Sequence, residues 1–306
     1  MARKSTASVV QAAPTKKKTP KRTAKKVASR KQKLTAETAD RHVLYEASVQ
    51  NVESEIDFVD ETFKRVRGRT ASLLREDFCG TGNTSCEWVR RRRANRAIGL
   101  DLDRPTLDWG LEHHVAKLSP AQRERVDLRE CNVLTPGDAV NVDCVLAMNF
   151  SYWILDTRDQ LRSYFEAVRE SLADDGMFFL DFYGGYESMK ETKEKREIDL
   201  EADSPYGKTK FTYVWHQARY EPISGRMECK IHFNFKDGTK FRNAFEYTWR
   251  LWTLPEIREL LTEAGFSNVT VYWEGEDEDG EGDGEFEPVE SGDADPAFIC
   301  YLTAEK

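Results

Sequence analysis

The spacing of apolar residues changes along the chain from a helical period to alternating strands and helices. Between residues 39 and 67 apolar side chains recur at steps of three and four, which predicts helix. Short apolar runs separated by helical segments follow, and they predict βαβ units and a parallel sheet. The expected strands are Ser72–Asp77, Ala97–Asp101, Val126–Glu130, Val142–Asn149 and Met177–Phe182. The expected helices are Thr84–Arg93, Pro105–Leu118, Arg158–Leu172 and Pro255–Ala264.

Residues 209–252 instead alternate apolar and polar side chains with a period of two. The runs KFTYVWHQARY, RMECKIHFNFKDG and TKFRNAFEYTWRLW predict an antiparallel β insertion with one aromatic face. Two closing strands, SNVTVYW and AFICYLTAE, follow it. The pattern predicts an α/β fold with a doubly wound, mostly parallel sheet of seven strands. We expect an antiparallel closing strand.

Charge is distributed unevenly along the 306 residues. Residues 1–36 hold 12 of the 46 basic side chains and no acid, so residues 37–306 carry 34 basic against 54 acidic ones, a net charge of −20. We expect residues 1–36 to be a disordered Lys-rich tail and residues 37–306 one domain. The tail could be a solubilising segment or a weak contact to nucleic acid or another polyanion. Residues 274–295 hold 12 acids and no base, and we expect an acidic loop there.

Cysteine usage and hydropathy indicate the compartment. The six cysteines are scattered without a CxxC pair, which favours reduced thiols in a cytoplasmic protein over a disulfide framework or a zinc site. His113 and His114 lack a third ligand nearby, so we expect no metal. Apolar runs stay far shorter than the roughly 20 residues of a membrane span, so no membrane contact is expected. The sequence leaves the oligomeric state open.

The stretch LLREDFCGTGNTSCEW, residues 73–88, combines a buried strand, three charged residues and a glycine turn. In a doubly wound sheet, ligands bind where strands end. Gly80 and Gly82 allow close approach of a ligand to the backbone, and Thr84 or Ser85 can cap the helix that follows. The charged residues therefore belong to the rim of a ligand crevice.

Polar residues at the next two strand ends extend this crevice. Asp101 lies 19 residues after Gly82, where a carboxylate can accept hydrogen bonds from both hydroxyls of a ribose. Asp103 competes for this role but is better placed to cap the next helix. Asn132 ends the third strand, where its amide could contact an adenine edge. Together these residues predict a nucleoside site.

The chain from about residue 73 to 181 resembles class I S-adenosylmethionine-dependent methyltransferases. Their first motif reads acid-x-Gly-x-Gly-x-Gly, which CGTG matches closely, and Asp101 matches their ribose-binding acid. LADDGMFFLDFYG is similar to the Gly turn before their fifth strand, and YTWRLWTLPEIRELLTEAGFSNVTVY to their closing helix and strand. The resemblance covers roughly residues 45–302 without the acidic loop. It implies S-adenosylmethionine as cofactor, contacted by Glu76, Phe78, Cys79, Gly80, Thr81, Gly82, Asp101, Leu102, Asn132, Val133 and Asn149.

Three positions depart from the family pattern. Phe78 stands where the first glycine is expected, so either the turn differs in shape or Phe78 contacts the methionine portion of the cofactor. Asn132 replaces the usual Asp, which still permits adenine contact. Arg75 could neutralise Glu76 and Asp77, which we favour, or pair with the methionine carboxylate.

The acceptor should approach from the ends of the fourth and fifth strands, NFSYW and DFYGG. The candidate catalytic residues are Asn149, Tyr152, Asp181 and Tyr183. Tyr152 could instead be a packing residue, and Asp181 could instead satisfy backbone groups at the strand end. The run from Asn149 to Tyr152 lacks the prolines typical of enzymes that methylate base or glutamine amino groups. The insertion after the fifth strand resembles the lids of small-molecule methyltransferases of this fold. The resemblance therefore implies that the insertion acts as a lid over a small-molecule acceptor with an N or O nucleophile.

Two other functions remain compatible with the sequence. An NAD-dependent oxidoreductase uses a similar glycine turn, but Ser85 stands where its third glycine would be. A nucleoside-binding module without catalysis, tethered to nucleic acid by residues 1–36, is the other alternative.

Overall fold

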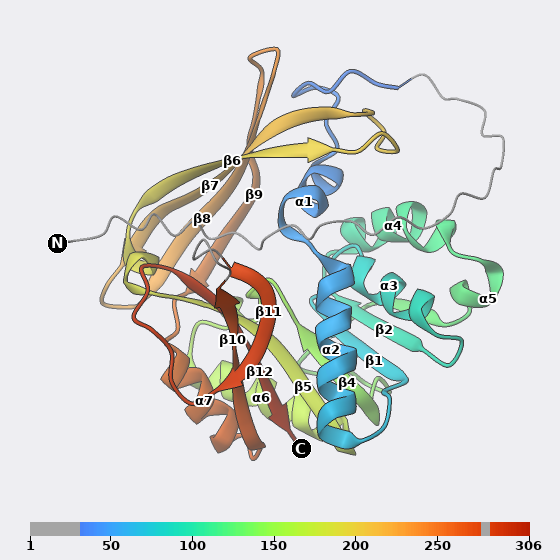
Figure 1. The fold of residues 1–306 in the computed structure, drawn as a ribbon, viewed down its shortest axis with the longest axis vertical. Coiled ribbons are helices and arrows are strands. Elements are labelled where there is room, and N and C mark those ends of the chain that lie inside the picture. The colour runs from blue at the N-terminus through green and yellow to red at the C-terminus, as the bar shows by residue number, and fades with distance from the viewer. Residues whose placement is uncertain (1–30, 277–281) are drawn as a thin grey trace.

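The structure is a computed structural model that describes residues 31–276 and 282–306. The predicted α/β class is confirmed. A large mixed sheet carries helices on both faces, and a small antiparallel sheet lies beyond one end of it (Figure 1). The part of the predicted tail that the structure describes contacts the small sheet, where the Ala36 amide donates to Thr239 Oγ1 (3.1 Å). The disorder predicted for residues 1–30 lies outside the described residues.

The large sheet has the strand order β11-β10-β12-β5-β4-β1-β2-β3. The five strands from β5 to β3 are parallel to one another, whereas β12 runs antiparallel to β5 and β10 antiparallel to β12. The carboxyl ends of β1, β2, β3, β4 and β5 therefore meet at one edge of the sheet. The strand bounds are β1 Leu73–Asp77, β2 Arg96–Asp101, β3 Val126–Glu130, β4 Val142–Ala147, β5 Leu172–Gly184, β10 Ser267–Glu276, β11 Gly282–Val289 and β12 Phe298–Glu305.

Two separate cores hold helices against the two faces of this sheet. On one face α2 and α3 bury side chains such as Phe63 and Trp88 against β1, β4 and β5. On the other face α6 and α7 bury side chains such as Phe165 and Leu260. Strands covered on both faces explain the continuous apolar runs in the sequence. The helix bounds are α1 Arg41–Val49, α2 Val52–Arg67, α3 Asn83–Arg91, α4 Arg104–His113, α5 Pro120–Arg123, α6 Arg158–Ser171 and α7 Leu254–Glu263, with 3₁₀ turns at Val115–Lys117, Ser151–Ile154 and Tyr186–Met189.

The small sheet has four strands, one more than the predicted insertion. Its order is β6 Thr192–Leu200, β7 Thr209–Glu221, β8 Arg226–Phe235 and β9 Lys240–Arg250, and every pair is antiparallel. The predicted bounds of 209–252 miss β6, whose sequence TKEKREIDL is almost entirely polar. The predicted aromatic face is present, and Phe211, Phe233 and Phe235 form a core with Leu44 of α1.

The predicted acidic loop is wrong in part. Residues 274–276 belong to β10, and residues 282–289 form β11, an eighth strand at the edge of the large sheet. Phe286 holds this otherwise acidic strand against the sheet, because its ring contacts the ring of Tyr301 (centroids 4.6 Å apart). Residues 277–281 of the predicted loop lie outside the described residues.

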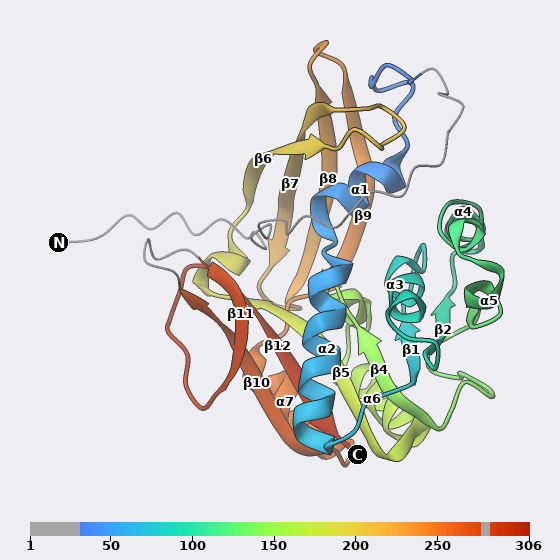
Figure 2. The same cartoon turned by 45° about the vertical axis from the view of Figure 1, so that its right-hand side comes forward.

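The predicted helix over residues 39–67 is two helices, which meet at Gln50 and Asn51. Asp40 caps α1 by accepting from the amides of His42 and Val43. The backbone is extended at Gln50, so α1 turns away from α2 and lies between the small sheet and α4 (Figures 1 and 2). None of the described helices is both long and apolar enough to cross a membrane.

Candidate functional site

The charged residues at the end of β1 have separate roles. Arg75 is completely buried and forms a bidentate ion pair with Asp77, Nε to Oδ1 at 2.8 Å and Nη2 to Oδ2 at 3.0 Å. Its Nη1 donates to the Ala139 carbonyl (3.0 Å), and the Tyr164 hydroxyl donates to Asp77 Oδ2 (2.9 Å). Arg75 therefore neutralises Asp77 inside the core, as favoured from the sequence, but the structure shows no ion pair between it and Glu76.

Glu76 points to the other side of β1 and caps α3. One carboxylate oxygen accepts from both the amide (2.8 Å) and the hydroxyl (2.6 Å) of Ser85. The expectation that Thr84 or Ser85 caps this helix is thus wrong, because the cap comes from the preceding strand. Burial raises the pKa of Glu76 to about 7.

The turn after β1 keeps a glycine-like conformation although Phe78 replaces a glycine. Phe78 has φ +56°, in the left-handed region, and Gly80 and Gly82 share that region with φ +53° and +66°. The Phe78 ring lies edge-on to Tyr164 (centroids 5.5 Å apart), so it packs beside the buried ion pair. A non-glycine residue in this region costs about 1–2 kcal/mol, which this contact can offset. Phe78 therefore adopts a backbone conformation that glycine takes readily.

The end of β2 organises the same turn. One oxygen of Asp101 accepts from the Gly80 amide (2.8 Å) and the other from the Asp103 amide (2.8 Å). Each oxygen keeps a second lone pair for a ligand. Asp103 caps α4 by accepting from the Thr106 amide, as expected. The neighbouring Leu102 side chain is 66% exposed, which leaves an apolar surface at this strand end.

The remaining predicted cofactor residues differ in accessibility. Asn132 is exposed, and its Oδ1 accepts from the Leu134 amide (3.0 Å), which leaves its NH₂ group available. Val133 and the Cys79 thiol are buried, and burial raises the pKa of Cys79. These two can present only backbone groups to a ligand.

Helix α1, which the sequence did not connect to the site, covers the glycine turn. Glu46 Oε1 accepts from the Thr81 hydroxyl (2.7 Å) and lies 2.7 Å from Nε2 of His114. One turn further, Asn83 donates to Gln50 (3.1 Å). The helical period of residues 39–67 indicated a helix but not the surface that it contacts.

The end of β4 is held by Asp181 of β5. Its two carboxylate oxygens accept from the amides of Asn149 (2.7 Å) and Phe150 (2.9 Å), which both have positive φ. Burial raises the pKa of Asp181 to about 7. Asp181 thus satisfies backbone groups, the alternative left open by the sequence, while it also lines a pocket with Asn149.

Tyr152 does not lie in this pocket. It is fully buried, and its hydroxyl donates to the Asp181 carbonyl (2.8 Å), so the expectation that Tyr152 meets the acceptor is corrected to a packing role. Tyr183 does line the pocket, where its hydroxyl donates to Gln217 (3.1 Å) and burial raises its pKa.

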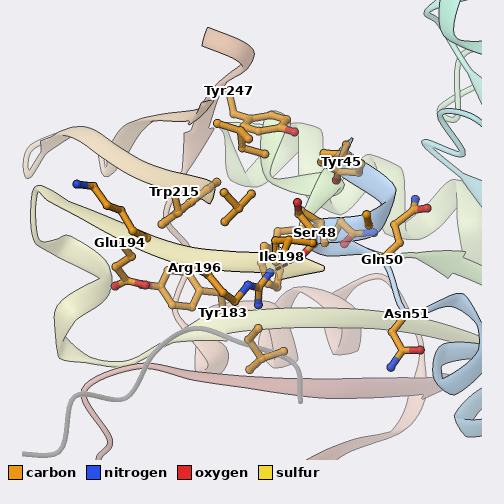
Figure 3. A pocket seen from close by; sticks show the side chains of 18 of the residues that line it. Tyr45, Ser48, Gln50, Asn51, Tyr183, Glu194, Arg196, Ile198, Trp215 and Tyr247 are labelled. Carbon is orange, nitrogen blue, oxygen red and sulfur yellow. Dashed lines mark hydrogen bonds between the residues drawn. The ribbon is translucent and has the colours of Figure 1, made fainter. Parts of the chain in front are cut away.

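The pocket has a volume of about 560 Å³ and lies between α1, the ends of β4 and β5, and the inner face of the small sheet (Figure 3). Strand β6, absent from the predicted insertion, supplies one wall through Glu194, Arg196 and Ile198. The aromatic lining residues are Tyr45, Phe150, Tyr183, Tyr213, Trp215, Tyr247 and Trp249.

Three buried carboxyl groups belong to the elements around the pocket and the glycine turn. Besides Glu76 and Asp181, Glu55 of α2 is only 3% exposed, and burial raises its pKa to about 7. Repulsion from Glu55 further raises the pKa of both other carboxyl groups. Glu55 Oε2 has no hydrogen-bond partner among the described residues. Sequence reasoning missed Glu55 because it lies among the many acids of α2.

Within the described ranges, no group of three His, Cys, Asp or Glu side chains could hold a metal ion.

Comparison with known proteins identifies the fold through structure alone. No protein-family model and no curated protein matches the chain. Among solved structures it is similar to an S-adenosylmethionine-dependent methyltransferase from Clostridium acetobutylicum ATCC 824, with 16% identity, a TM-score of 0.61, and coverage of 86% of this chain and 96% of the other.

Two sugar methyltransferases are similar to the same extent. CalS10, an amino pentose methyltransferase from Micromonospora echinaspora, is 18% identical with a TM-score of 0.60, over 86% of this chain and 95% of CalS10. The sugar N-methyltransferase KedS8 from Streptoalloteichus sp. ATCC 53650 is 13% identical with a TM-score of 0.59, over 94% of this chain and 99% of KedS8.

Proposed function

We propose, from the premise that this chain has the fold of class I S-adenosylmethionine-dependent methyltransferases, that it transfers a methyl group from S-adenosylmethionine to a small-molecule acceptor. The observation that carries the proposal is a set of three buried carboxyl groups: Glu76 lies directly before the glycine turn, Asp181 lines the pocket, and Glu55 of α2 raises the pKa of both. Buried carboxylates without a cation are costly, so these groups favour a positively charged ligand. S-adenosylmethionine carries positive charge on its sulfur and on its amino group.

The residues at the strand ends fit the rest of the cofactor. Asp101 offers a free lone pair on each oxygen to the ribose hydroxyls. Leu102 offers an exposed apolar surface and Asn132 a free NH₂ group to the adenine. Gly80 and Gly82 let the cofactor approach the backbone. This distribution supports an adenosyl group at β2 and β3 and a cationic end near β1, β4 and β5.

The chemistry requires positioning more than acid–base groups. When bound, S-adenosylmethionine supplies a methyl group that a nucleophile can take by in-line displacement. Helix α1 covers the glycine turn and the small sheet forms one side of the pocket, which limits the access of water to the reacting groups. Asp181 fixes the turn at Asn149 and Phe150, so Asn149 faces the acceptor in a defined position.

The pocket favours a small acceptor, and we propose an N or O nucleophile. Its volume of about 560 Å³ suits a compact molecule, and its aromatic walls suit a sugar ring or an amine held by cation–π contact. CalS10 and KedS8 are named as methyltransferases of an amino pentose and of a sugar nitrogen, which supports an amino group as the nucleophile here. Asn149 and Tyr183 are the proposed acceptor contacts.

A pH dependence follows from the raised carboxyl pKa values. In the folded protein burial raises the pKa of each of these groups to about 7, well above the ordinary pKa of an exposed carboxyl group. Their contribution to stability is complete below about pH 4 and is lost as the pH rises through 7. A bound cation lowers these pKa values, so we expect S-adenosylmethionine binding to release protons and to tighten between about pH 5 and 8. Calorimetry in buffers of different ionisation enthalpy measures the release. Proton uptake on binding would contradict this expectation.

Methyl transfer itself is tested by incubating the protein with S-adenosylmethionine and fractionated cell metabolites. Mass spectrometry should detect a small molecule that gains one methyl group as S-adenosylhomocysteine accumulates. The matched control is Asp101→Ala, which should form both products more slowly at limiting cofactor. Methylation of added nucleic acid, with no small molecule modified, would contradict the proposed acceptor class.

A further inference from the structure

Arg196 is an unusual residue in the wall of the acceptor pocket. Its side chain comes from the inner face of β6 and points toward Ser48 of α1 (Figure 3). One terminal nitrogen donates to the Ser48 carbonyl, and the guanidinium lies over the Tyr213 ring, 5.3 Å from its centroid. Its Nε is buried without a hydrogen-bond partner among the described residues.

No carboxylate neutralises this guanidinium within the part of the chain that the structure describes. The acids beside Arg196 on β6 are engaged elsewhere, because Lys210 pairs with both Glu197 (2.5 Å) and Asp199 (3.5 Å). Glu194 faces the pocket at a different place along the strand (Figure 3). Burial lowers the pKa of Arg196, which reflects a desolvated charge that lacks a counter-ion.

A desolvated arginine that lines a pocket and has no carboxylate partner among the described residues is suited to an oxyanion. The guanidinium presents its donors as a planar fork that matches a carboxylate or a phosphate. The contacts to Ser48 and Tyr213 fix the fork in place, which reduces the entropy lost when an anion binds. The pocket lining also contains a second base, Lys195, and five acids, so an anionic group can bind at Arg196 but not along the wall as a whole. The acids are Asp181, Glu194, Glu197, Asp199 and Glu201.

Resting on the proposed function, we propose that the methyl acceptor carries an anionic group, a carboxylate or a phosphate, which Arg196 binds. The nucleophile of the same molecule lies toward Asn149 and Asp181, and its apolar part contacts the aromatic walls. Arg196 is then the residue that selects acceptors by charge.

Three small aromatic probes test this proposal with the full chain. Benzoate and benzamide have nearly the same shape and differ in charge, and phenyl phosphate replaces the carboxylate by a phosphate. Binding is measured by calorimetry or saturation-transfer NMR, with and without saturating S-adenosylhomocysteine. An anion held by one charged hydrogen-bonding pair should bind about 10- to 100-fold more tightly than the neutral probe. The preferred anion distinguishes a carboxylate from a phosphate acceptor.

Variants of β6 separate recognition from a structural role. Arg196→Gln should remove the preference for an anion, Arg196→Lys should keep part of it, and Lys193→Gln, an exposed residue outside the pocket, should keep all of it. Equal binding of benzamide and both anions by the unmodified protein would overturn the proposal. An unchanged preference for anions in Arg196→Gln would also overturn the proposal. If Arg196→Gln does not fold, an undiminished preference in Arg196→Lys would overturn it instead. S-adenosylhomocysteine binding by the same samples tests the proposed function separately, because it does not require Arg196.

Discussion

Replacing Arg75 with methionine should lower the free energy of unfolding by about 3–5 kcal/mol, the cost of leaving a buried carboxylate without its partner. Asp77 is buried and depends on Arg75 for both of its ion-pair contacts. Among the described residues, the Tyr164 hydroxyl would be the one remaining side-chain partner of Asp77 (2.9 Å). The variant also loses the contact that ties β1 to the Ala139 carbonyl. Urea denaturation followed by tryptophan fluorescence measures the change.

Two controls show whether the burial of the pair causes this loss. Arg75→Met combined with Asp77→Leu removes both charges and should recover much of the stability. Arg129→Met breaks ion pairs with Asp127 and Asp138 that are more exposed, and it should cost at most about 1 kcal/mol. A loss in Arg75→Met no larger than that in Arg129→Met would mean that water reaches Asp77.

Asp101→Ala should weaken S-adenosylhomocysteine binding by about 1–3 kcal/mol, which is roughly 5- to 150-fold. The substitution removes the acceptors for the ribose hydroxyls and releases the amides of Gly80 and Asp103, which shape the turn. Calorimetric titration measures the change in affinity. The control is Asp127→Ala, an exposed acid on the adjacent strand β3, which should bind as well as the unmodified protein. Equal weakening in both variants would indicate a general effect of charge.

The sequence predicted elements whose side chains face a dry core. Strands β4 and β5 are buried on both faces, and their apolar runs were recognisable. The acids at helix starts and strand ends were recognisable from their position in the sequence. Asp103 caps α4 and Asp101 ends β2, and each follows from its distance to a glycine turn or a helix.

Strands that do not pack against an apolar core were not predicted from the sequence. In β6 the inner face consists of Glu194, Arg196 and Ile198, because it faces a pocket instead of apolar side chains. The apolar alternation that identifies a strand is therefore missing. In β11 Phe286 is the principal contact in an acidic stretch, so its pattern is equally weak.

Long-range partners could not be read from local patterns either. Glu55 looks like one of several acids on α2, and only the tertiary structure shows that it is buried near Glu76 and Asp181. The prediction that Arg75 neutralises a neighbouring acid was correct. It pairs with Asp77 and not with Glu76, because successive side chains along β1 point to opposite faces of the sheet. The conformation of the turn at Phe78 could not be predicted, because the identity of one residue does not determine its backbone angles.

The central claim is that the crevice at the ends of β1, β2 and β3 binds S-adenosylmethionine. Its most direct test is calorimetric titration of the full chain with S-adenosylhomocysteine and, separately, with NAD. The account predicts saturable binding of S-adenosylhomocysteine with one molecule per chain and no measurable binding of NAD. Saturable binding of NAD, with none of S-adenosylhomocysteine, would contradict it.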